Sequence, residues 1–155
     1  MRKYNLDYTF DGYNISFLMY EAFYNQALSD IEKSKNISMI TKQTNKTGYI
    51  DSLIVSNIDL SKITLDKFMT LNKKTVESGF VKYNQSKYSD LYFECNWRKI
   101  YGKLFNYNLI LQNEIVYFSQ YVFSQNKSWY LISLSTDNKK QSRQLVKTIK
   151  KIHCN

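Results

Sequence analysis

The chain has 155 residues, the size of one ordinary domain that can bury a hydrophobic core. Apolar residues make up 43% of it and aromatic residues 16%, which excludes an intrinsically disordered chain. The formal net charge of +9 predicts a surface that attracts anions, although lysine serving as the default polar residue would give the same charge. No linker, repeat or change in composition divides the sequence, so we expect residues 1–155 to form a single domain.

The N-terminal segment, residues 4–17, has the pattern of a β-hairpin. Asp11-Gly12 separates two runs rich in apolar residues, and both central residues of a type I′ turn need a positive φ. Residues 18–31 carry apolar side chains at helical spacing, which indicates a short helix or an irregular turn. Strands are expected next at 37–42 and 49–58, joined by a turn at 45–48 and paired antiparallel.

A helix is predicted to begin after Thr64, which fits the N-cap position, with Asp66 in the first turn. Gly79 fits the C′ position at the other end. The apolar face of this helix would contain Leu65, Phe68, Leu71 and Val76. Residues 80–88 are expected to be extended chain or loop.

The second half of the chain predicts an antiparallel meander. Apolar and polar residues alternate over 91–98 and again over 101–111, as in strands with one buried face. The segment 115–123 is apolar on both faces, which is typical of a central strand that is covered on both sides. A strand at 129–134 completes the expected sheet.

A basic amphipathic helix is predicted to close the chain, with Thr136-Asp137-Asn138 suited to cap its N-terminus. Its apolar stripe would contain Leu145, Val146, Ile149 and Ile152. Its other side carries six cationic residues, which are Lys139, Lys140, Arg143, Lys147, Lys150 and Lys151. That side is either an ordinary solvated surface or an anion-binding face for lipid or nucleic acid.

Tyrosines are concentrated in the meander, and two roles would explain this concentration. The six concerned are Tyr92, Tyr101, Tyr107, Tyr117, Tyr121 and Tyr130. With the interleaved cations Arg98, Lys99 and Lys103 they could stack the bases of a nucleic acid. Packing within a sheet explains them equally well and is the commoner cause.

The sequence contains no motif typical of catalysis or metal binding. Its single histidine, His153, lies near the C-terminus, which argues against Ser-His-Asp, Cys-His and His-rich metal sites. Glu94 has no second carboxylate at a defined spacing, and no glycine-rich phosphate-binding loop is present. We therefore predict a protein that is not an enzyme and needs no cofactor or metal.

Two cysteines, Cys95 and Cys154, lie far apart and lack the spacing of a zinc site. In a secreted domain they would be a plausible disulfide, closing a loop of about 60 residues. Cys95 could instead be a small buried apolar residue in a strand, and Cys154 lies next to the last residue, where fraying is expected. The sequence leaves both alternatives open.

Four segments carry a resemblance to a known family: FDGYNISF at 10–17, GYIDSLIVS at 48–56, TLDKFMTLNKKTV at 64–76 and RQLVKTIKKI at 143–152. In this order, with the meander before the last of them, they resemble the PsbP-like fold family, named after a photosystem accessory protein. The resemblance covers nearly the whole chain. It implies an α+β fold, an α/β/α sandwich in which an antiparallel sheet of about six strands packs between helices.

The resemblance also implies a location, because small bacterial lipoproteins and secreted domains share this fold. We expect a non-enzymatic binding or accessory domain outside the cytoplasm, secreted or membrane-anchored through an N-terminal segment that has been removed. Its partner would be a protein or an anionic membrane surface. Met1-Arg2-Lys3-Tyr4 does not itself begin a signal peptide, because no apolar segment follows it. The alternative is a cytoplasmic protein that binds nucleic acid with its basic face.

Overall fold

In the computed structural model, the described residues are 2–20, 25, 39–44, 50–58, 63–78, 82–111, 114–125 and 127–154. Most of them lie in β-strands. The elements are β1 (Lys3–Phe10), β2 (Tyr13–Tyr20), β3 (Met39–Thr44), β4 (Ile50–Ile58), α2 (Leu65–Ser78), β5 (Lys82–Cys95), β6 (Arg98–Leu111), β7 (Glu114–Gln125), β8 (Ser128–Thr136), α3 (Lys139–Ser142), α4 (Gln144–Lys150) and β9 (His153–Cys154).

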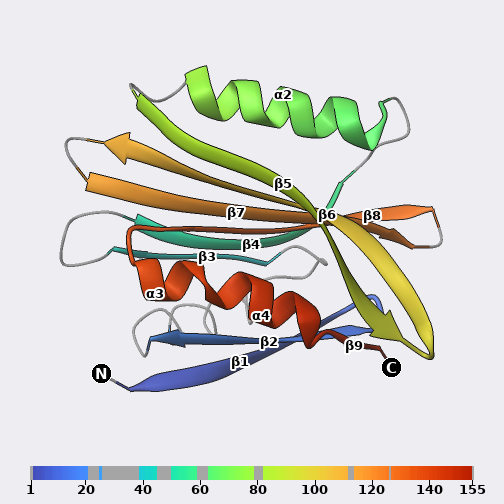
Figure 1. The fold of residues 1–155 in the computed structure, drawn as a ribbon. Helices are drawn as coiled ribbons and strands as arrows, with labels where there is room; N and C mark the ends of the chain where they lie inside the picture. Colours follow the sequence, from blue (N-terminus) through green and yellow to red (C-terminus); the bar gives the residue numbers. More distant parts are fainter. Residues whose placement is uncertain are drawn as a thin grey trace.

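The strands form two antiparallel sheets, as Figure 1 shows. The smaller sheet has the order β1-β2-β9, and the larger has the order β3-β4-β8-β7-β6-β5. The expected α/β/α sandwich, with one sheet packed between helices, is therefore wrong. The β1–β2 hairpin pairs with the C-terminal β9 and does not join the meander. The smaller sheet formed in this way covers one side of the larger sheet together with the C-terminal helices.

The main hydrophobic core lies between the two sheets and the C-terminal helices. α4 contacts β2 and β5, while α3 contacts β7 and β8. The hairpin contributes Phe17 and Met19, and α4 contributes Leu145 and Ile149, all of them fully buried. Burial of this apolar surface is the main force that holds the smaller sheet against the larger one.

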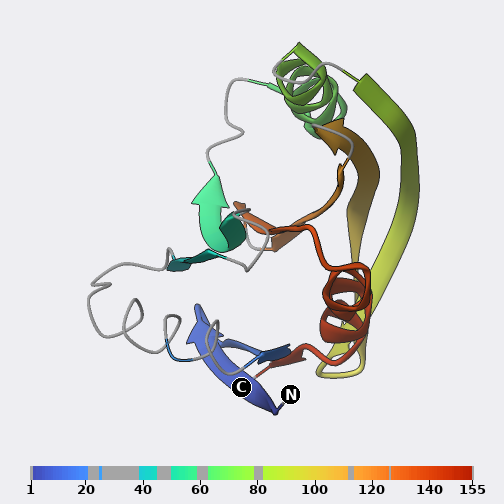
Figure 2. The same ribbon diagram turned by 90° about the vertical axis from the view of Figure 1, so that its left-hand side faces the viewer.

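A second core lies on the opposite side of the larger sheet, beneath α2. It contains Met69 of α2 with Phe105, Tyr107, Leu109 and Val122 of the sheet. Figure 2 shows α2 at one end of the molecule and the β1–β2 hairpin at the other. Strand β7 sends side chains into both cores, which confirms the prediction of a central strand covered on both sides.

Four predictions that rest on local patterns are confirmed. Asp11 and Gly12 form the hairpin turn with φ values of 45° and 82°. The Lys67 N–H donates to Thr64 Oγ1 at 3.2 Å, so Thr64 caps α2. β3 and β4 pair antiparallel. Asn138 caps the first C-terminal helix, because its Oδ1 accepts a hydrogen bond from the Gln141 N–H at 3.1 Å.

Two local predictions are corrected. The strand expected over 91–98 ends at Cys95, and Asn96 and Trp97 turn the chain with φ values of 49° and 66°. Of the two alternatives for 80–88, extended chain or loop, the structure shows extended chain, because β5 begins at Lys82. The C-terminus does not fray at Cys154, which pairs with Tyr13 in β9.

Other predicted elements fall partly or wholly outside the described residues. Of the segment 18–31, residues 18–20 belong to β2, and 21–24 and 26–31 lie outside the described residues. The turn at 45–48 and Gly79 lie outside them as well. Within the part of the chain that is described, no helix is long and apolar enough to cross a membrane.

Candidate functional site

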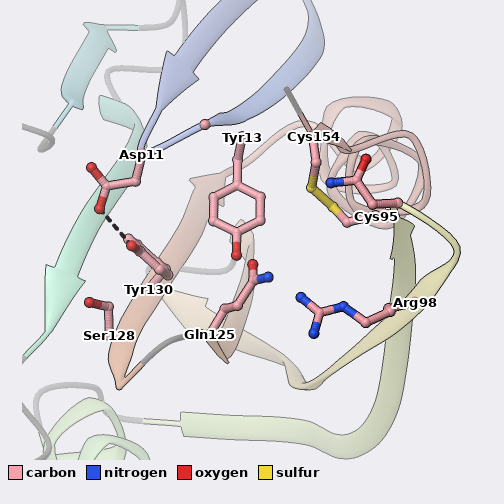
Figure 3. Close-up of a pocket in the computed structure, with 10 residues that line it drawn as sticks. Asp11, Tyr13, Cys95, Arg98, Gln125, Ser128, Tyr130 and Cys154 are labelled. Atoms are coloured by element: carbon pink, nitrogen blue, oxygen red, sulfur yellow. Dashed lines mark hydrogen bonds between the residues drawn. A yellow bond between two sulfur atoms is a disulfide. The ribbon is translucent and has the colours of Figure 1, made fainter.

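A small polar cavity lies where the ends of several strands converge. It has a volume of about 210 Å³ and opens between the β1–β2 turn, the β5–β6 turn, the β7–β8 connection and β9. Asp11, Tyr13, Arg98, Gln125 and Tyr130 supply polar groups to its lining, as Figure 3 shows. These residues are far apart in the sequence, and the pairing of antiparallel strands brings their turns together.

The left side of the cavity in Figure 3 is fixed by a hydrogen bond between the two sheets. The Tyr130 hydroxyl, from β8, donates to the Asp11 carboxylate at 2.6 Å. Burial and this hydrogen bond to Asp11 raise the pKa of Tyr130 to about 12. At neutral pH Tyr130 is therefore protonated and donates a hydrogen bond to Asp11. This hydrogen bond occupies one acceptor position of the Asp11 carboxylate.

Tyr13 has its ring in the main core, and its hydroxyl points toward Gln125 in Figure 3. Its ring packs against Phe93, Phe123 and Tyr130 at centroid distances of 5.3–6.0 Å, and only 4% of the residue is exposed. Burial raises the pKa of Tyr13, while the positive charge of Arg98 opposes that rise. Among the described residues, no group hydrogen-bonds to the Tyr13 hydroxyl.

The right side of the cavity is closed by a disulfide and by Arg98. Cys95 and Cys154 are joined, with their Cα atoms 5.3 Å apart, and the bond links the end of β5 to β9. Figure 3 shows the Arg98 guanidinium and the Gln125 amide pointing toward the Tyr13 hydroxyl. No ion pair or hydrogen bond to the Arg98 guanidinium is found in the described part of the chain.

The polar side chains of this cavity can bind a ligand by hydrogen bonds and charge. They are the Arg98 guanidinium, the Gln125 amide, the Asp11 carboxylate and the hydroxyls of Tyr13, Ser128 and Tyr130. Over the described ranges, no group of three His, Cys, Asp or Glu side chains could hold a metal ion. His153, the single histidine, is exposed on β9 and pairs through its backbone with Asn14.

The six cationic residues predicted at the C-terminus lie on the exposed side of α3, α4 and the residue after α4. All six are exposed, while Leu145, Thr148 and Ile149 on the other side of α4 are buried. For none of the six is an ion pair found within the described residues. We call these six residues the basic helix face.

A second hollow connects this face to strand β5. It has a volume of about 610 Å³ and is bordered by Lys150 and His153 on one side and by Tyr92 and Glu94 on the other. β5 is an edge strand of the larger sheet, so no further strand separates it from the C-terminal helix. The hollow therefore places the basic helix face beside the outer surface of the β5–β6 hairpin.

The tyrosines of the meander divide between packing and exposure. Tyr107, Tyr121 and Tyr130 are buried in the cores, as sheet packing predicts, and Tyr117 is half-buried. Tyr92 and Tyr101 are 43% and 63% exposed, and they form a cross-strand pair with ring centroids 5.6 Å apart. The Lys99 ammonium lies 4.8 Å from the centroid of the Tyr92 ring, which is a cation–π contact.

The cations interleaved with those tyrosines do not share one surface. Arg98 points into the cavity, whereas the neighbouring Lys99 covers Tyr92 on the opposite face of β6. Lys103 is held by Asp90 at 2.6 Å, and this ion pair raises the pKa of Lys103. The three cations therefore do not flank the tyrosines on one common surface, as the base-stacking interpretation would require.

Sequence reasoning missed Trp97, which is fully exposed at the tip of the β5–β6 hairpin. It was assigned to a strand face because it continues the alternation of Leu91, Phe93 and Cys95. The available signal was the preceding Asn96, a residue that tolerates positive φ and often begins tight turns. Trp97 therefore belongs to the surface around the cavity and not to the core.

Comparisons with known proteins add no assignment. No family model matches the sequence, and no curated protein matches it. Among solved structures, the chain is similar to a crystal structure of PA94 from Pseudomonas aeruginosa, a protein of unknown function. The two share 11% identity at a TM-score of 0.45, over 85% of this chain and 82% of that chain. A likeness of this size identifies neither a family nor a function.

Proposed function

We propose that this protein is a non-enzymatic binding domain that acts outside the cytoplasm and docks on an anionic membrane surface. The observation that carries the proposal is the basic helix face. Its six cations are all exposed, and none has an acidic partner among the described residues. A charge near an anionic membrane contributes about 1 kcal/mol per Lys or Arg, so a group of this size supports reversible surface binding.

The way the C-terminal helix packs leaves its basic side free to contact a membrane. Leu145, Ile149 and Ile152 are buried in the main core, so the helix cannot insert its apolar side into lipid without unfolding the domain. The basic side faces outward and is available for contact. Docking would therefore be electrostatic and sensitive to salt, with the helix lying flat against the headgroups.

Trp97 supplies an apolar anchor near this surface. It is fully exposed at the hairpin tip, and tryptophan is enriched where a membrane meets water, since its ring suits the headgroup region. Lys99 and Tyr101 follow it on the exposed face of β6. Together with the basic helix face, this hairpin tip would give two points of contact.

The Cys95–Cys154 disulfide supports the proposed location. Such bonds persist in oxidising compartments and are rare in the cytosol, where reductants keep thiols free. A protein expressed in the cell of origin, quenched with acid and alkylated, would report whether the two thiols are oxidised there.

The membrane proposal is tested by sedimentation with vesicles of phosphatidylcholine alone or mixed with phosphatidylserine. We expect binding only to the mixed vesicles and loss of binding as salt rises. The double variant K147Q/K150Q should weaken binding on the order of 10-fold or more. K67Q/K74Q, which removes the same charge from the exposed side of α2, is the matched control and should bind as the parent does.

Two outcomes would reject this function. Equal binding to neutral and anionic vesicles would show that the basic helix face is not the determinant. No binding to either, together with salt-dependent binding to a single-stranded oligonucleotide, would favour the alternative of a nucleic-acid-binding protein. The exposed Tyr92–Tyr101 pair would then be the site for base stacking, and Y92A/Y101A would be the variant to test.

A further inference from the structure

We infer that the polar cavity at the strand ends binds a small molecule through a carboxylate group. This inference is independent of the proposed membrane docking, because it rests on a different set of side chains. Three groups carry it: the Tyr13 hydroxyl, the Arg98 guanidinium and the Gln125 amide, which point toward one another in Figure 3.

The Tyr13 hydroxyl is the most informative of the three. The residue is 4% exposed, and its hydroxyl is directed into the cavity. A buried polar group without a partner is unfavourable, so such groups are normally satisfied by protein, solvent or ligand. Within the described residues nothing pairs with this hydroxyl, and it is not one of the fully buried unpaired polar atoms, so solvent or a ligand in the cavity can supply its partner.

Arg98 provides the charge for an anionic ligand. It follows the β5–β6 turn, where its backbone pairs with Cys95, and this register directs its side chain to the cavity instead of the outer face. A guanidinium presents two parallel N–H donors that match the two oxygens of a carboxylate. The acid that lines the cavity, Asp11, already accepts from Tyr130 and makes no ion pair with Arg98.

The charge and size of the cavity favour a carboxylate over a phosphate. Arg98 is the one cation of the lining and the Asp11 carboxylate already accepts from Tyr130, so the cavity offers one positive charge for a monoanionic carboxylate and no second cation for a phosphate dianion. A volume of about 210 Å³ lies below the 300–1,000 Å³ typical of drug-sized ligands. The ligand is therefore a compact carboxylate, with the Gln125 amide as a further hydrogen-bond donor.

The surrounding framework fixes the backbone on both sides of the cavity before a ligand arrives, while the Arg98 side chain itself is exposed. The disulfide ties Cys95, three residues before Arg98, to the last strand. The hydrogen bond from Tyr130 to Asp11 fixes the turn that precedes Tyr13. Backbone that is ordered in advance reduces the entropy lost on binding.

The experiment is a calorimetric titration of the intact, oxidised protein with acetate, propionate and benzoate in turn, and with inorganic phosphate as the competing anion. We expect at least one carboxylate to bind and phosphate to bind more weakly. R98Q should reduce that affinity by roughly 10-fold or more, as expected for loss of charge-assisted hydrogen bonds. R98K, which keeps the charge but removes the paired donors, should also weaken binding.

K99Q is the matched control, because it removes one charge at the next position on the opposite face of β6 and should leave the affinity unchanged. Y13F should weaken binding several-fold without exposing the ring, and its circular dichroism should match that of the parent. The inference is overturned if no carboxylate binds, if phosphate binds more tightly, or if R98Q binds as well as K99Q does.

Discussion

The hydroxyl of Tyr121 donates a hydrogen bond of 2.8 Å to the backbone carbonyl of Leu91. Tyr121 lies on β7 and Leu91 on β5, so the side chain crosses the whole of the intervening strand β6. Its path passes over Gly102, where an added Cβ would lie 2.5 Å from the ring carbon Cζ and 2.6 Å from the hydroxyl oxygen. The hydrogen bond therefore depends on a residue without a side chain.

Gly102→Ala should destabilise the fold by about 1–3 kcal/mol, the range for forcing an extra group into a packed core. The ring of Tyr121 cannot simply move away, because it is fully buried, and the backbone oxygen of Val122 would also lie 2.6 Å from the new Cβ. Urea unfolding of both proteins measures the difference. In the double variant Gly102→Ala/Tyr121→Leu, the smaller side chain should recover part of the free energy of unfolding that Gly102→Ala loses. If the effects of the two substitutions are strictly additive, the alanine does not clash with the Tyr121 ring.

Tyr121→Phe should cost about 1 kcal/mol, since it removes one hydrogen bond while leaving the ring in place. The carbonyl of Leu91 would lose this donor in a partly buried position. Tyr92→Phe is the matched control, because its ring is exposed and the same hydroxyl is removed from the outer face. Equal unfolding free energies for the two variants would show that the hydrogen bond to Leu91 contributes nothing.

The features that could be predicted from the sequence are those that depend on the chemistry of a few neighbouring residues. The Asp11-Gly12 turn and the caps at Thr64 and Asn138 follow from conformational preferences of single residues, and each is found where it was expected. The two-sided apolar pattern of β7 likewise predicted a central strand. These features need no knowledge of distant contacts.

What could not be predicted depends on pairing between distant segments. The hairpin β1–β2 meets β9, which lies more than a hundred residues later, and nothing in either segment specifies that partner. The turn at Asn96-Trp97 was missed because it lacks glycine and continues the apolar alternation. The cavity is formed by the pairing of the hairpin with β9 and by the turn at Asn96-Trp97. No pattern in the sequence therefore predicts that Tyr13, Arg98 and Gln125 lie together.

The bond between Tyr130 and Asp11 predicts a loss of stability in alkali. In the folded protein the pKa of Tyr130 is raised from 10.0 to about 12, so this phenol keeps its proton where an unfolded chain has lost it. Its contribution is fully present below pH 10 and falls as pH rises from 10 to 12. Urea unfolding at a series of pH values should therefore show a declining free energy over that window.

Tyr130→Phe should lower stability at neutral pH and make this decline shallower. Some decline will persist, because burial also raises the pKa of Tyr121 and of Tyr8. Tyr101→Phe, on the exposed face of β6, serves as the control and should leave the pH profile unchanged. An identical slope in the parent and in Tyr130→Phe would contradict the assignment to Tyr130.

Reduction of the Cys95–Cys154 bond should lower the free energy of unfolding by about 2–4 kcal/mol, the usual value for a bond that closes a long loop. The bond spans 59 positions, and it ties β9, which pairs with β2, to the end of β5. Because β9 pairs at only two positions, its exchange with solvent deuterium should accelerate more than that of β7. The double variant C95A/C154A, studied without reductant, separates this effect from the chemistry of the reductant. If that variant unfolds at the same urea concentration as the oxidised parent, the bond does not restrain the fold.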